Sequence, residues 1–196
     1  MSFYENYKFP DASYNLNFDD HGWFPKWNSQ LLLPLVKDKK LVLEIGSWLG
    51  KSTREWLKNS SAHVICVDTW GGSIEHNKND TRVINLYNQF VANQREWGNR
   101  ISMMQMTSVK ALLELQKYPE VQPDFIYIDA SHQYEDVYLD LSLCYNTYPN
   151  AIICGDDWGW HNKTQGKRQT VQEAVKEFCK NYNLEYEANH WAWRLK

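Results

Sequence analysis

Acidic side chains recur in this chain directly after short apolar runs that predict buried strands. Asp129 ends one such run, and the pair Asp156 and Asp157 follows another. Ligands of an open α/β sheet bind beyond the carboxyl ends of its strands, so three carboxylates on neighbouring strands would converge and repel one another. All-oxygen ligation favours a hard ion, which makes Mg²⁺ the expected ligand, with Mn²⁺ or Ca²⁺ as alternatives. The other interpretation is that one acid caps a helix and another faces solvent.

A turn that contains two glycines is the second feature that could bind a ligand. Residues 41–45 predict a buried strand, Gly46 and Gly50 a tight turn, and residues 51–59 a helix, which together aim backbone N–H groups at a ligand. The stretch from Gly46 to Thr53 resembles a phosphate-binding loop, but only three residues separate the glycines where that loop needs four. Glu44 would also repel a triphosphate, so a cationic ligand is favoured.

A further acid, together with this turn, indicates a nucleotide-binding site. Asp68 ends the next apolar run, a little over twenty residues after Gly46, where α/β nucleotide sites place a carboxylate on ribose hydroxyls. With Glu44, Gly46 and Gly50, it resembles the class I S-adenosylmethionine-dependent methyltransferases, although Trp48 replaces their middle glycine. The resemblance implies an S-adenosylmethionine cofactor and, with a serine that often meets the adenine, these cofactor-binding residues: Glu44, Gly46, Ser47, Gly50, Ser52, Asp68, Thr69, Trp70, Ser108 and Asp129.

The acids after the later strands carry a more specific resemblance. The pattern Asp129-x-x-His132-x-Tyr134, followed by Gly155-Asp-Asp-Trp158, is similar to the metal-dependent small-molecule O-methyltransferases that modify antibiotic sugars, and to the cephalosporin-hydroxylase-like family. The similarity runs from about residue 41 to residue 178 and implies that Asp129, Asp156 and Asp157 bind a divalent ion that holds a substrate diol.

The pattern leaves two roles open for His132. Several antibiotic-sugar enzymes have a second acid as the proposed base, where this chain has Ser131 followed by His132. Histidine titrates near neutrality and could take a hydroxyl proton, so His132 and Asp129 are the expected catalytic residues. The alternative for His132 is a partner that orients a ligand aspartate.

Strands alternate with helices along the chain, which predicts an α/β fold. The methyltransferase resemblance implies a Rossmann-like, doubly wound, mostly parallel seven-stranded sheet in the order 3-2-1-4-5-7-6, closed by an antiparallel C-terminal hairpin. Residues 1–40 are expected to form an arm and a helix that cover a methyltransferase domain of residues 41–196. The expected strands are 41–45, 63–68, 101–106, 124–129, 151–155, 184–188 and 191–195; the expected helices are 26–36, 51–59, 81–97, 109–117, 135–146 and 169–181.

Composition limits the partners. The net charge of -3 gives no basic footprint, so nucleic acid is not an expected partner. The sequence shows no amino-terminal signal and no long apolar stretch, so we expect no membrane contact and a cytoplasmic protein. The four cysteines lack metal-type spacing and are expected to be reduced core residues. The aromatic arm could join a homo-oligomer.

The sequence therefore predicts an S-adenosylmethionine-dependent, divalent-metal-dependent O-methyltransferase. Its expected partner is a small-molecule hydroxyl acceptor, such as a sugar, a polyol or a natural product. Two alternatives stay open: a non-catalytic cofactor-binding module of the same fold, and a phosphate-loop nucleotidase.

Overall fold

One sheet organises the computed structural model, which describes residues 1–72, 84–161 and 170–196. Within these residues the sheet has seven strands in the order β3-β2-β1-β4-β5-β7-β6, and only the last pairings, β5 with β7 and β7 with β6, are antiparallel. The predicted fold class is confirmed. The strands are β1 Leu41–Ile45, β2 His63–Asp68, β3 Ile101–Gln105, β4 Phe125–Ile128, β5 Ile152–Gly155, β6 Tyr186–Ala188 and β7 Trp193–Leu195.

Strand alternation divides the apolar side chains between two cores. On β1, Val42 packs into one buried cluster, whereas Leu43 and Ile45 pack into the other, as the two-residue period of a strand requires. The parallel register pairs Ile45 with Val67 on β2 and with Ile128 on β4. The carboxyl ends of the three strands therefore lie at one edge of the sheet.

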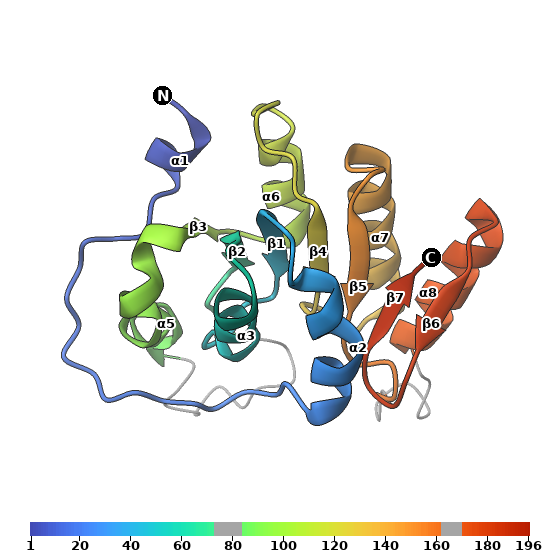
Figure 1. The fold of residues 1–196 in the computed structure, drawn as a ribbon, viewed down its shortest axis with the longest axis horizontal. Helices are drawn as coiled ribbons and strands as arrows, with labels where there is room; N and C mark the ends of the chain where they lie inside the picture. Colours follow the sequence, from blue (N-terminus) through green and yellow to red (C-terminus); the bar gives the residue numbers. More distant parts are fainter. Residues whose placement is uncertain (73–83, 162–169) are drawn as a thin grey trace.

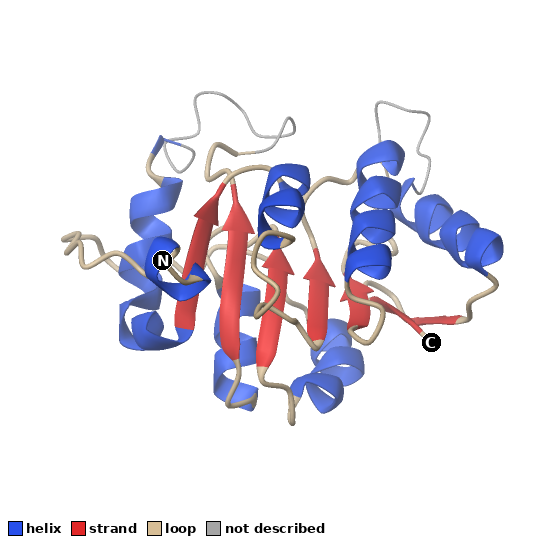
Figure 2. Cartoon of the chain, turned by 90° about the horizontal axis from the view of Figure 1, so that it is seen from above, coloured by secondary structure: helices blue, strands red, loops and turns tan. Residues whose placement is uncertain are grey.

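Helices cover both faces of the sheet (Figures 1 and 2). The cluster that contains Val42 includes residues of α2, α3 and α5, and the cluster that contains Leu43 includes residues of α6, α7 and α8. None of the described helices combines the length and apolar character needed to cross a bilayer. The helices are α1 Phe3–Asn6, α2 Lys26–Val36, α3 Lys51–Asn59, α5 Leu86–Gln94, η1 Arg95–Arg100, α6 Ser108–Leu115, α7 Tyr134–Thr147 and α8 Thr170–Tyr182.

The helices differ from the predicted ranges at a few ends. The helix expected over 81–97 begins in residues outside the described part and is divided between α5 and the 3₁₀ helix η1. Helix α6 begins at Ser108 and ends at Leu115, whereas the predicted range was 109–117. Helix α2 has the predicted range, and Pro34 lies in its last turn, where the missing N–H removes a single backbone hydrogen bond.

The N-terminal arm lies against the domain, although its sequence has no clean periodicity. Phe3 is fully buried, and the carbonyl of Tyr7 accepts a hydrogen bond of 2.8 Å from the Met103 N–H, so the arm pairs with the β3 edge. From there the chain runs along the end of the sheet that holds the carboxyl ends of the strands and enters α2 (Figure 1). The Asp20 carboxylate forms ion pairs with Lys51 and Arg54 in the first turns of α3.

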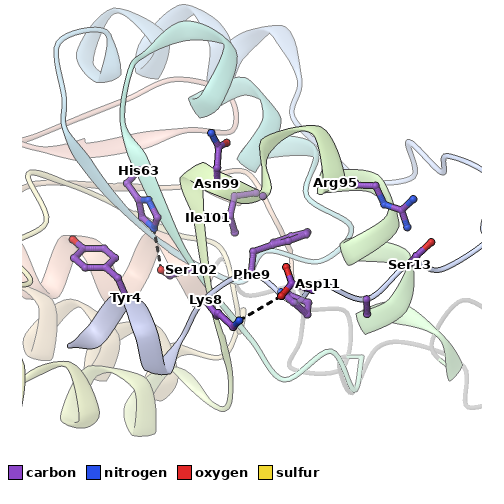
Figure 3. Close-up of a pocket in the computed structure, with 13 residues that line it drawn as sticks. Tyr4, Lys8, Phe9, Asp11, Ser13, His63, Arg95, Asn99, Ile101 and Ser102 are labelled. Carbon is purple, nitrogen blue, oxygen red and sulfur yellow. Dashed lines mark hydrogen bonds and ion pairs between the residues drawn. The ribbon is translucent and has the colours of Figure 1, made fainter. Parts of the chain in front are cut away.

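A hollow of about 690 Å³ lies at the other end of the strands, between the arm and the amino ends of β2 and β3 (Figure 3). Phe9, His63 and Ser102 contribute to its lining. Burial and the nearby Arg100 guanidinium lower the pKa of His63 to about 4, so this imidazole is neutral at physiological pH. The hollow is separate from the acids at the carboxyl ends.

Candidate functional site

The turn after β1 has a backbone that glycine makes possible. Gly46 and Gly50 have φ angles of 94° and 80°, in the region that favours glycine. A Cβ on Gly46 would lie 2.0 Å from the carbonyl oxygen of Asp129, closer than any atom can come. The turn is therefore in direct contact with the end of β4, where the predicted acids begin.

Trp48, which replaces the middle glycine of the family motif, also has a positive φ, of 47°. Such a conformation costs a non-glycine residue roughly 1–3 kcal/mol. Hydrogen bonds hold Trp48 in place: its N–H donates to Asp68 at 2.8 Å, its indole donates to His21 at 3.3 Å, and its carbonyl accepts from the Trp70 indole at 2.9 Å. The turn therefore keeps a glycine-like backbone without the glycine.

Glu44 lies beneath this turn and has no exposed surface. Its carboxylate accepts hydrogen bonds from the Trp56 indole at 2.8 Å and from the Thr53 hydroxyl. Burial raises the pKa of Glu44, and these donors oppose the increase. Side-chain donors of the following helix meet the carboxylate, so Glu44 supports the turn from beneath. Its predicted contact with a ligand stays a prediction. Ser47 and Ser52 are also buried.

Asp68 lies at the end of β2 beside the turn. Its two oxygens accept the N–H groups of Trp48 at 2.8 Å and Trp70 at 2.7 Å, and burial raises its pKa. The Trp70 ring is only 4% exposed and packs on Tyr87 and Phe90, so its side chain belongs to the core. Thr69 is exposed at the same edge.

Ser108, the predicted adenine contact, is half-buried at the start of α6. Burial raises the pKa of the nearby Asp140 carboxyl group to about 6, and the Ser108 hydroxyl opposes the increase.

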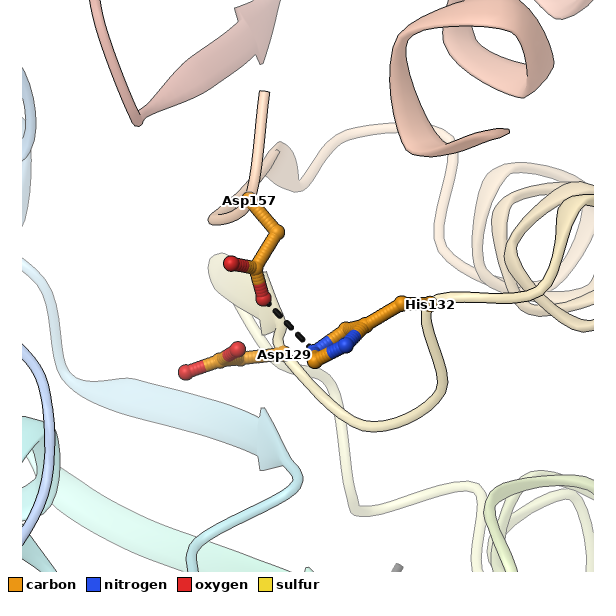
Figure 4. A group of neighbouring side chains, drawn as sticks. All are labelled: Asp129, His132 and Asp157. Carbon is orange, nitrogen blue, oxygen red and sulfur yellow. Dashed lines mark ion pairs between the residues drawn. The ribbon is translucent and has the colours of Figure 1, made fainter. Parts of the chain in front are cut away.

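Asp129, His132 and Asp157 form a group of possible metal ligands (Figure 4). One ligand atom from each lies within 4.8 Å of the others, and His132 Nε2 is 2.7 Å from Asp157 Oδ2. Burial and the charges of Asp156 and Asp157 raise the pKa of Asp129 well above its usual range. Asp157 has a φ of 60°, in the left-handed region that a few per cent of non-glycine residues adopt and that aspartate adopts more often than most.

Asp156, the third predicted metal ligand, lies outside this group. Its Oδ2 accepts from the Asn28 amide at 2.6 Å and from the Tyr127 hydroxyl at 3.1 Å, and its Oδ1 accepts from the Asp157 N–H at 2.7 Å. Burial and the Asp157 charge raise its pKa to about 7. The structure therefore differs from the prediction: internal donors occupy Asp156, and His132 completes the group in its place.

Two residues of this site were not predicted from the sequence. Tyr127 stands two residues before Asp129, and its hydroxyl lies 3.3 Å from the Asp129 carboxylate. The two-residue period of a strand puts both side chains on one face, so this contact could have been predicted. Asn28 lies 128 residues from Asp156 along the chain, and no local pattern indicates that contact.

A comparison with known protein families gives a match to the part of the chain that contains this site. The family model described as a methyltransferase domain matches residues 43–158, a range that spans the glycine turn, Asp68 and the Asp129–His132–Asp157 group. No curated protein sequence matches the chain significantly.

Several solved structures share the fold. A candidate caffeoyl-CoA O-methyltransferase from Staphylococcus aureus has a TM-score of 0.63 at 16% identity over 89% of this chain and 85% of that one. An O-methyltransferase from Bacillus cereus in complex with SAH has a TM-score of 0.59 at 14% identity over 91% and 84%. The O-methyltransferase TomG from Streptomyces achromogenes, involved in tomaymycin synthesis and in complex with SAM, has a TM-score of 0.58 at 12% identity over 84% and 76%.

Proposed function

The chain belongs to the methyltransferase-domain family, and on that premise we propose that it transfers a methyl group from S-adenosylmethionine to a hydroxyl oxygen of a small molecule. The observation that carries the proposal is the contact between the glycine turn and the acidic group, in which a Cβ on Gly46 would lie 2.0 Å from the Asp129 carbonyl oxygen. The contact supports a cofactor turn beside a group that could hold a metal ion and the acceptor. Methyl transfer needs the cofactor and the acceptor to lie next to each other.

The residues around the turn suit a cationic nucleoside. S-adenosylmethionine, when bound, supplies an electrophilic methyl group on a sulfonium. Asp68, partly exposed beside the turn and fixed by two backbone N–H groups, would accept the ribose hydroxyls. Gly46 and Gly50 keep side chains out of the turn, and the Ser108 oxygen would accept a hydrogen bond from the adenine amino group. Thr69 lies at the exposed rim.

The acidic group suits a divalent cation. Asp129 is half-buried beside Asp156 and Asp157, and burial together with the charges of these two acids raises its pKa; a bound cation would relieve both effects. Asp129 and Asp157 would hold Mg²⁺ or Mn²⁺, which would lower the pKa of an acceptor hydroxyl. His132, oriented by its 2.7 Å contact with Asp157, would take the hydroxyl proton.

Removal of the metal tests this proposal. Dialysis against a chelator is expected to reduce methyl transfer to a panel of vicinal diols, both catechols and sugars, by at least about a hundredfold. Addition of Mg²⁺ or Mn²⁺ should restore it, with formation of S-adenosylhomocysteine as the measurement. S-adenosylmethionine binding by the chelated protein is the control for intact folding.

Two other results would have different meanings. Full activity after chelation would exclude a metal from the reaction and leave methyl transfer in place. Binding of S-adenosylmethionine without turnover on any acceptor would favour the non-catalytic module. The family match and the buried Glu44 beneath the turn already favour methyl transfer over a phosphate-loop nucleotidase.

A further inference from the structure

Asn28 of helix α2 contacts Asp156, the acid next to the Asp129–His132–Asp157 group. Asn28 lies in the first turn of α2, has no exposed surface, and donates from Nδ2 to Asp156 at 2.6 Å and to the Tyr127 hydroxyl at 3.3 Å. Its Oδ1 is buried and has no hydrogen-bond partner among the described residues. Burial of an unpaired acceptor costs stability, so the favourable role of this side chain lies in the donation from Nδ2. The family match begins at residue 43 and does not include Asn28.

The Asn28 amide supplies a hydrogen-bond donor that the Tyr127 hydroxyl alone cannot provide to both Asp129 and Asp156. The Tyr127 hydroxyl lies 3.1 Å from Asp156 Oδ2 and 3.3 Å from Asp129 Oδ2. A phenol carries one proton and cannot donate to both carboxylates at once. Because Asn28 supplies a second donor to Asp156, the Tyr127 proton can be shared with Asp129. Without Asn28, one of the two carboxylates would lose a donor.

The effect of Asn28 continues to Asp157. Asp156 uses its other oxygen to accept the Asp157 N–H at 2.7 Å, and this N–H belongs to a residue with a positive φ of 60°. A backbone in that region persists only when its surroundings hold it. The Asp156 carboxylate is one such support, and its orientation depends on the Asn28 amide.

We propose that Asn28 is a positioning residue of the candidate metal site: it fixes the Asp156 carboxylate, which in turn holds the backbone that presents Asp157 to the group. The inference rests on the proposed function in one respect, namely that Asp129 and Asp157 bind a divalent ion. It adds that helix α2, which precedes the residues matched by the family model, is part of the site.

A reversal of donor and acceptor tests the proposal. Calorimetric titration with Mn²⁺ would be made on the wild type, Asn28→Asp, Asp156→Asn and the double variant. Asn28→Asp replaces the amide donor with a carboxyl group 2.6 Å from Asp156, and loss of the orienting N–H bond is expected to weaken Mn²⁺ binding about 10- to 100-fold. The double variant restores the bond with its direction reversed and should bind within about threefold of the wild type.

The controls separate positioning from charge and folding. Asn59→Asp adds the same charge at an exposed position on α3 and should leave Mn²⁺ affinity unchanged. Urea denaturation establishes that each variant is folded. If Asn28→Asp does not fold, Asn28→Ala takes its place, with an expected loss of at least about tenfold.

The Mn²⁺ titrations distinguish the role of Asn28 from the existence of the metal site. A double variant that binds Mn²⁺ no better than Asn28→Asp would overturn the role of Asn28, as would wild-type affinity in a folded Asn28→Asp or Asn28→Ala. No Mn²⁺ binding by the wild type would instead overturn the metal site of the proposed function and, with it, this inference.

Discussion

Asparagine in place of Asp129 is expected to reduce methyl transfer by roughly a thousandfold, because a metal site supplies several kcal/mol of stabilisation to the reaction. Asp129 belongs to the Asp129–His132–Asp157 group, and its carbonyl packs against the glycine turn. Asparagine keeps the shape and the backbone contact and removes the charge. Turnover and Mn²⁺ affinity should both fall, while S-adenosylmethionine affinity should stay within a few-fold of the wild type.

The same substitution is expected to stabilise the metal-free protein. Burial and neighbouring acids raise the pKa of Asp129 in the folded state, so the folded protein holds this proton more tightly than the unfolded chain does. The carboxyl group therefore costs stability once the pH rises above its unfolded pKa of about 4, and the cost grows until the pH passes the folded pKa. Asp129→Asn removes that cost.

Urea denaturation over a pH series, with a chelator present, measures this effect. The variant should exceed the wild type in free energy of unfolding at neutral and mildly alkaline pH, and the difference should vanish as the pH falls below about 4. Asp38→Asn, at an exposed position, is the control and should show no comparable gain. A wild type as stable as Asp129→Asn at alkaline pH would contradict the account of repelling carboxylates.

The second large effect is expected from His132→Gln. If His132 is the base, kcat should fall about 10²- to 10⁴-fold, while the affinities for S-adenosylmethionine and Mn²⁺ stay near those of the wild type. Added imidazole should recover part of the rate. His190→Gln, at an exposed histidine, is the matched control.

A different outcome would reassign His132. If His132→Gln lowers Mn²⁺ affinity and the rate falls only through weaker metal binding, its contact with Asp157 serves to orient a ligand or the imidazole is itself a ligand. An unchanged kcat at saturating metal would exclude His132 as the base.

The sheet could be predicted because its signals are local. Short apolar runs that end in acids marked the strands, and the glycine turn after residues 41–45 marked the point around which the family fold is arranged. The order 3-2-1-4-5-7-6 came from the family resemblance and is confirmed. The N-terminal arm carried no such signal, because Phe3 and Tyr7 are held by tertiary contacts and not by a periodic pattern.

The site could be predicted only in part, for a similar reason. Strand ends placed Asp129 and Asp157 at one edge, but the direction of each carboxylate depends on distant partners. Asp156 turns toward Asn28, which lies 128 residues away in sequence, and Glu44 is enclosed by donors from the following helix. Sequence spacing fixes where a residue stands on a strand, whereas packing decides which groups satisfy it.

The most direct test of the central claim is calorimetric titration of S-adenosylmethionine, with and without Mg²⁺, into the wild type and into Asp68→Ala. The account predicts one-to-one binding to the wild type in both conditions, and at least about tenfold weaker binding to Asp68→Ala, since a lost hydrogen bond to a charged group is worth 1.5–3 kcal/mol. Absence of binding to the folded wild type in both conditions would contradict the assignment of the glycine turn as a cofactor site.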